Sequence, residues 1–187
     1  MSTHYDAFSD LATRTIDLVL TALASPAGAA EARRGDRTRS HMRLNHYTVG
    51  DPVPDGEQGS LNELGDVALG EHTDSGLVTL LVQDATGGLQ ALSGDDGWID
   101  VEPRRGAIVV DLADCMQVLT NDRYRAATHR VLPMGESDRM SIPYLLNPPI
   151  DATIEPMEHV GTNAPAYRPF VFGEFINAPP SVRARGS

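Results

Sequence analysis

The chain has 187 residues, 41% of them hydrophobic, with 26 acidic and 15 basic residues and a formal net charge of −11. This length fits one domain with a sizeable core, and the negative charge argues against nucleic acid or an anionic membrane as a partner. The single cysteine, Cys115, excludes a disulfide framework and disfavours a cysteine-based zinc site.

The N-terminal part is expected to form one helix and a loop that pack on the rest of the chain. Residues 1–10 have neither a basic nor an apolar region typical of a signal peptide, and no apolar run could span a bilayer, so we expect a cytoplasmic protein. Residues 5–24 carry apolar side chains at helical spacing. These are Phe8, Leu11, Ile16, Val19, Leu20 and Leu23. The predicted division is therefore a helix and loop over 1–40 and a core over 41–187.

The remainder is rich in short β-type runs. Residues 41–49 predict a strand, and 50–66 are rich in Gly, Pro and acids, which indicates an exposed loop. Further runs follow at short intervals, with a hairpin-like turn, GDDG, at 94–97. A short helix is expected near 117–124, and another helix or packing segment near 167–176. Many short strands joined by short links predict a sandwich or a jelly roll.

Two potential metal ligands open one of these apolar runs, in the stretch GEHTDSGLVTLLVQD at 70–84. His72 and Asp74 are two residues apart, so on a strand they would share a face. His129 stands at the start of another apolar run, ATHRVLPM. Two histidines and one carboxylate form the facial triad of non-haem Fe(II) oxygenases. From the spacing alone, hydrogen-bonded structural histidines are the more common explanation.

An arginine and a serine follow at the same spacing, in RMSIPYLL. Arg139 and Ser141 would share a face, where a guanidinium and a hydroxyl can hold a carboxylate. A surface ion pair is the alternative. An arginine that faces the interior is costly without a partner anion, and a bound dicarboxylate would supply one.

The joint pattern over about 42–149 resembles the isopenicillin N synthase-like 2-oxoglutarate/Fe(II)-dependent dioxygenases. The resemblance is carried, in order, by RLNHY, GEHTDSGLVTLLVQDATGGLQAL, GWIDVEPRRGAIVVDLADCMQVLTNDRYRAATHRVL, RMSIPYLLNPP and YRPFVFGEF. It implies a mainly β fold, a double-stranded β-helix (jelly roll) with an N-terminal helix and few flanking helices. The chain departs from the family in its short N-terminal region and in a longer loop at 50–66.

The resemblance also implies a site. His72, Asp74 and His129 would bind Fe(II), and Arg139 and Ser141 would hold the distal carboxylate of 2-oxoglutarate. Contacts of Tyr47 and Asn45 with this cosubstrate, and of Leu80 and Leu145 with the pocket, are implied as well. With O2, the enzyme would hydroxylate, desaturate or cyclise a small organic substrate, releasing succinate and CO2; a natural-product intermediate is the expected kind.

Two alternatives remain open from the sequence. One is an Fe(II) oxidase of the same fold that does not use 2-oxoglutarate; the other is a truncated, non-catalytic jelly-roll subunit. Acidic residues in the loop hint at a cationic substrate, although a solvated loop is the favoured interpretation. These are Asp55, Glu57, Glu63 and Asp66. The short N-terminal region further suggests a homodimer, or a missing N-terminal partner region, that covers an exposed sheet edge.

Overall fold

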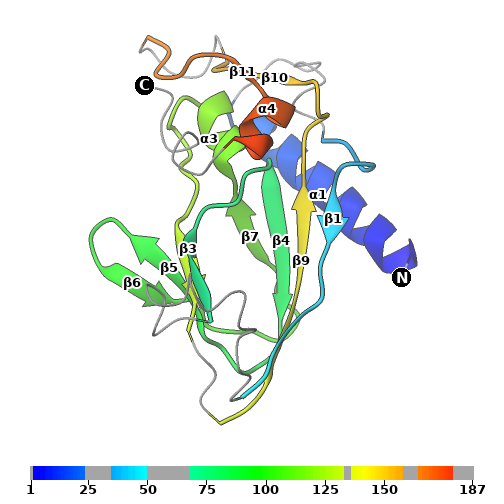
Figure 1. Cartoon of the computed structure of the whole chain (residues 1–187), viewed down its shortest axis with the longest axis vertical. Helices are drawn as coiled ribbons and strands as arrows, with labels where there is room; N and C mark the ends of the chain where they lie inside the picture. The colour runs from blue at the N-terminus through cyan, green and yellow to red at the C-terminus, as the bar shows by residue number, and fades with distance from the viewer. Residues whose placement is uncertain (1, 24–34, 50–67, 133–135, 158–163, 179–187) are drawn as a thin grey trace.

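The computed structural model describes residues 2–23, 35–49, 68–132, 136–157 and 164–178 of the chain. Two antiparallel sheets face each other, and a long helix covers the outer side of the larger one (Figure 1). The expected loop at 50–66 and its acidic residues lie outside the described residues. No helix in the described ranges is long and apolar enough to cross a bilayer. The predicted jelly roll is confirmed.

The larger sheet has five strands in the order β1-β9-β4-β7, with β2 also paired to β9. Its strands are β1 (His41–Met42), β2 (Asn45–Tyr47), β4 (Val78–Gln83), β7 (Val109–Leu112) and β9 (Arg139–Leu146). The strand expected at 41–49 is therefore two short strands, both of which pair with β9.

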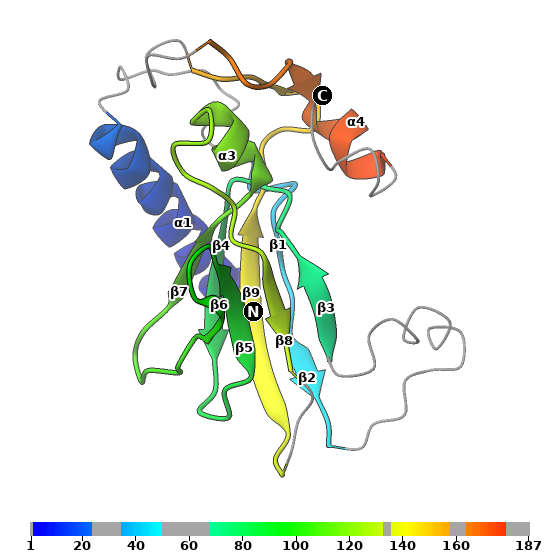
Figure 2. The ribbon, with the colours of Figure 1, turned by 90° about the vertical axis from the view of Figure 1, so that its left-hand side faces the viewer.

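The smaller sheet has the order β3-β8-β5-β6. It consists of β3 (Leu69–His72), β5 (Leu89–Ser93), β6 (Gly97–Asp100) and β8 (His129–Val131). The expected hairpin joins β5 to β6, with Ser93 opposite Gly97, whose φ of 71° is the left-handed conformation that glycine tolerates best. Figure 2 shows the sheets in the second orientation, with short helices and the β10-β11 pair at one end.

The remaining elements are the helix on the outer side of the larger sheet and short elements at one end of the framework. They are α1 (Ser2–Ala22), α3 (Asp114–Leu119), β10 (Thr153–Ile154), β11 (Phe170–Val171) and α4 (Phe172–Asn177). The helix expected near 117–124 is α3, which begins earlier in the chain. The segment at 167–176 contains both a short strand and a helix.

The main core lies between α1 and the outer face of the larger sheet. Ala12 and Ile16 of α1 are buried, at 0% and 1% exposure, and pack in one cluster with Leu80 and Tyr144 of the sheet. The helical spacing predicted this face, but Leu11 is 39% exposed, because the buried stripe runs through Ala12 instead. The opposite face of the same sheet is left to line a pocket.

Candidate metal centre

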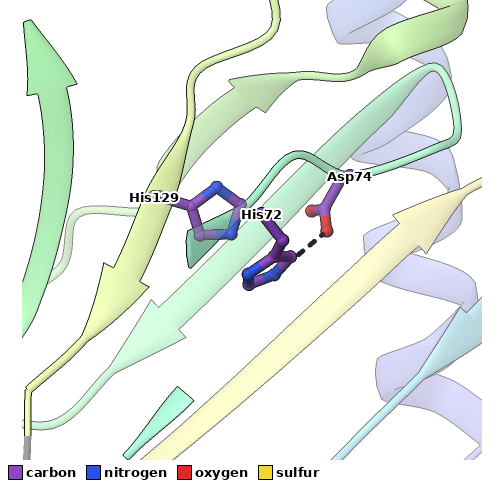
Figure 3. A group of neighbouring side chains, drawn as sticks. All are labelled: His72, Asp74 and His129. Carbon is purple, nitrogen blue, oxygen red and sulfur yellow. Dashed lines mark ion pairs between the residues drawn. The ribbon is translucent and has the colours of Figure 1, made fainter. Parts of the chain in front are cut away.

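His72, Asp74 and His129 lie where the two sheets meet (Figure 3). His72 ends β3 and His129 begins β8, and the two residues are directly opposite each other in the antiparallel ladder. Asp74 lies beyond the end of β3, in the connection that crosses to β4. The expectation that His72 and Asp74 share a strand face is wrong, because the strand ends at His72. One ligand atom from each residue nevertheless lies within 4.8 Å of the others.

Hydrogen bonds orient all three side chains. The Nδ1 atoms of His72 and His129 lie 2.8 and 3.0 Å from the carbonyl oxygens of Gly70 and Ala127, respectively. Since a carbonyl oxygen only accepts, each Nδ1 carries the proton and each Nε2 keeps a free lone pair.

The Asp74 carboxylate is held by a hydroxyl group. Thr79 donates a hydrogen bond to its Oδ2, which leaves Oδ1 free at 3.9 Å from Nε2 of His72. Two imidazole nitrogens and one carboxylate oxygen thus converge. This donor set fits a divalent first-row metal ion, and a 2-His-1-carboxylate set is typical of non-haem Fe(II).

A second carboxyl group, Asp111 of β7, stands beside this centre. It is opposite Thr79 in the ladder, and its Oδ2 lies 3.7 Å from Nδ1 of His129. That oxygen is buried and has no hydrogen-bond partner among the described residues. Burial, and then the charge of Asp74, raise the pKa of Asp111 to about 7. Sequence reasoning missed Asp111, although a lone acid in the apolar strand GAIVVDL was the available signal.

Arg139 and Ser141 meet at the other end of the pocket. Arg139 is 1% exposed, and its guanidinium donates to the Gly87 carbonyl (2.8 Å), to Ser141 Oγ (3.0 Å) and to Gln83 Oε1 (3.1 Å). It also lies 5.2 Å from the ring centroid of Tyr47. Within the described ranges it has no carboxylate at ion-pair distance. Burial lowers the pKa of Arg139, as expected for a cation without a paired anion.

A pocket of about 300 Å³ joins the two ends. All seven residues expected at the site line it. The register explains why Asn45 and Tyr47 belong there, since they are opposite Ser141 and Arg139. Leu145 also lines the pocket. Leu80 does not: it points to the other face of the sheet and lies in the core under α1.

Comparisons with known proteins agree with this arrangement. A family model described as the 2OG-Fe(II) oxygenase superfamily matches residues 38–148. Gibberellin 2-beta-dioxygenase 4 of Arabidopsis thaliana is 32% identical over 98% of this chain and 59% of its own length. A 1-aminocyclopropane-1-carboxylate oxidase of Musa acuminata is 44% identical over 57% of this chain and 36% of its own length.

A solved structure gives the same result for the fold. A full-length Neurospora crassa protein, crystallised in complex with alpha-KG, superposes with a TM-score of 0.77 and 29% identity, over 93% of this chain and 54% of that one. The chain thus spans between about a third and three fifths of the length of these relatives.

Proposed function

The chain belongs to the 2OG-Fe(II) oxygenase superfamily, and from that premise we propose that it is an Fe(II)- and 2-oxoglutarate-dependent oxygenase of a small organic substrate. The observation that carries the proposal is the pairing of two features in one pocket. One is a converging set of two histidines and a carboxylate, and the other is a buried arginine that forms no ion pair with any described residue. Hydroxylation is the proposed reaction, with desaturation or ring closure as variants.

The first role in the proposal is metal binding. His72 and His129 would bind Fe(II) through Nε2, and Asp74 through Oδ1. The Gly70 and Ala127 carbonyls and the Thr79 hydroxyl would keep these atoms turned toward the ion, as partners of metal ligands commonly do.

The second role is to hold the cosubstrate. Arg139 and Ser141 would bind the distal carboxylate of 2-oxoglutarate, with Asn45 and Tyr47 beside it. Arg139 is held in place by Gly87 and Gln83, so its donors are oriented before the anion arrives. A bound carboxylate would also pair directly with this buried cation, whereas the charge of Asp84 acts on it from beyond ion-pair distance.

The third role is to exclude water. Between the two polar ends the pocket is lined largely by aliphatic side chains, among them Leu81, Val109 and Pro143. When bound, Fe(II) and 2-oxoglutarate would supply the activation of O2 and the oxidation of a C–H bond, with succinate and CO2 as coproducts. The residues of the chain would orient the substrate in a dry, apolar space next to the metal ligands.

The test is an anaerobic titration with Fe(II) and then 2-oxoglutarate, followed by visible absorption for a metal-to-ligand charge-transfer band. We expect a band in the wild type, its loss in His129→Ala, and a much weaker 2-oxoglutarate affinity in Arg139→Ala. Arg105→Ala is the matched control, because Arg105 is an exposed arginine in a turn remote from the pocket lining. Iron binding without a band would favour an oxidase that does not use 2-oxoglutarate, and failure to bind iron would refute the proposed centre.

Other expectations from the sequence stay proposals. These are the division into 1–40 and 41–187, the cytoplasmic location, and a homodimer or N-terminal partner region that completes the structure. One observation bears on the proposed homodimer: β7 is an edge strand of the larger sheet, and its Val110 is 50% exposed.

A further inference from the structure

Arg43 lies on the pocket side of the larger sheet, between β1 and β2. Its backbone N–H donates to the Pro143 carbonyl at 3.0 Å, so this segment stays in register with β9. Side chains alternate between the faces of a sheet. The neighbouring Leu44 is 68% exposed on the outer side, whereas Arg43 lines the pocket. The guanidinium is therefore directed to the same face as Asn45 and Tyr47.

The strand register also fixes where Arg43 lies between the metal end of the pocket and the end that holds Arg139 and Ser141. Two residues earlier, His41 is opposite Leu145, which in turn is opposite Thr79, the residue that holds Asp74. Two residues later, Asn45 is opposite Ser141 of the carboxylate clamp. Two residues along a strand correspond to about 7 Å. Arg43 thus lies two residues along the strand from the metal end of the pocket, and two residues from the position opposite Ser141.

The guanidinium of Arg43, an exposed residue, has no anion at ion-pair distance among the described residues. Its side chain makes no hydrogen bond or ion pair with any residue that the structure describes, in a protein with 26 acidic and 15 basic residues. The other arginine in the pocket lining is Arg139, which already donates three hydrogen bonds and whose proposed ligand is 2-oxoglutarate. A guanidinium offers five donors and no acceptor, and no described residue engages those of Arg43, so a second anion can bind them.

His41 shows that this cation lies near the metal centre. Burial, and then the positive charge of Arg43, lower the pKa of His41, while the charge of Asp74 opposes this. The imidazole therefore lies within the electrostatic reach of both Arg43 and a metal ligand.

We propose that Arg43 anchors the substrate through a carboxylate, so that the substrate class is a small carboxylic acid with an apolar body. The body would lie against the aliphatic lining, which includes Leu69, Leu81 and Leu89. The carboxylate would sit on Arg43 and hold the remainder of the molecule at the metal end. This inference rests on the proposed function and adds the substrate class to it.

The carboxylate that binds Arg43 could also belong to 2-oxoglutarate, as the carboxylate at its metal-facing end. The two sources separate in a binding experiment. Arg43→Gln, Arg139→Gln and the control Arg105→Gln each remove one guanidinium. In each variant, the affinity for 2-oxoglutarate is measured anaerobically from the charge-transfer band. We expect a large loss in Arg139→Gln and values within about twofold of wild type in the other two.

The second step uses matched probes on the anaerobic protein saturated with Fe(II) and 2-oxoglutarate. Hexanoate and 3-phenylpropanoate are titrated beside hexanamide and 3-phenylpropanamide by calorimetry. A charge-assisted hydrogen bond predicts that the wild type binds each acid about 10- to 100-fold more tightly than its amide. Arg43→Gln should abolish that preference and leave amide binding unchanged, and Arg43→Lys should restore part of it.

Three results would overturn the inference. They are no preference for acids in the wild type, a preference that survives Arg43→Gln, and a loss of 2-oxoglutarate affinity in Arg43→Gln as large as in Arg139→Gln. The last would assign Arg43 to the cosubstrate. If no charge-transfer band forms in the wild type, the proposed function fails first, which distinguishes that failure from failure of the substrate class.

Discussion

Replacing Asp111 by asparagine should change fold stability and metal affinity in opposite directions. In the metal-free protein, Asp111 is a buried carboxyl beside Asp74, with one oxygen that has no hydrogen-bond partner among the described residues. A pKa of about 7 in place of 3.8 corresponds to an upper limit of about 4 kcal/mol of destabilisation by the ionised form. An asparagine side chain at this position would carry no charge, so we expect Asp111→Asn to be more stable than the wild type at pH 8.

The sign follows from the proton balance. Because the pKa of Asp111 is higher in the folded protein, the folded state holds this proton longer than the unfolded state does. The wild type therefore loses stability as the pH rises from about 4 to about 7. The free energy of unfolding of Asp111→Asn should accordingly exceed that of the wild type only slightly near pH 4. The difference should grow up to about pH 7 and stay constant above it.

With a metal ion present, the effect should reverse. The Asp111 charge lies beside His129 and favours a bound cation, so we expect the variant to bind Co(II) about 10- to 100-fold more weakly. Unfolding in urea with EDTA gives the stability, and titration of the Co(II) d–d bands gives the affinity. Asp96→Asn, an exposed acid in the β5–β6 turn, is the control for loss of one charge. A variant that is less stable without metal, or that binds Co(II) like the wild type, would refute this reasoning.

Three further predictions concern single side chains. Thr79→Val should weaken Co(II) binding by about tenfold or more, because Asp74 loses its hydroxyl donor, while Thr79→Ser keeps the donor and the affinity. Gly76→Ala should lower the thermal midpoint strongly, since a Cβ there would lie 2.7 Å from the Leu146 carbonyl oxygen; Gly94→Ala, with open space around it, should change it little. Ile16→Ala should cost about 2–5 kcal/mol in urea unfolding, because Ile16 is 1% exposed in the core under α1, and Leu18→Ala, on the exposed side, should cost far less.

The sequence predicted most of the strands and brought forward seven residues that the structure places in one pocket lining, because both depend on local patterns. Apolar runs and turn residues located the strands, and the ordered motifs identified the histidines, the aspartate and the arginine. The same information did not reveal which face of β4 lines the pocket. Leu80 was expected at the pocket, yet the pleat turns it toward α1, and Thr79 and Leu81 face inward instead.

The positions that local patterns did not predict depend on the register between strands far apart in the chain. Asp111 joins the site only because β7 pairs with β4 and brings it opposite Thr79, and no local pattern contains that pairing. Asp74 lies outside the strand for a similar reason: β3 belongs to one sheet and β4 to the other, so the chain must leave one ladder before it enters the next. The Asp74 carboxylate projects from this crossing point. A single sequence does not mark where the chain crosses.

The cross-strand position of the two ligand histidines has a consequence for the order of folding. His72 and Asp74 are neighbours in the chain, whereas His129 becomes their neighbour only when β8 pairs with β3. A nascent or unfolded chain therefore offers a metal ion two ligands, and the third is gained with a long-range contact that forms slowly. Metal added during refolding should bind tightly only after the smaller sheet has closed, and the bound ion then holds β3 and β8 together against local opening.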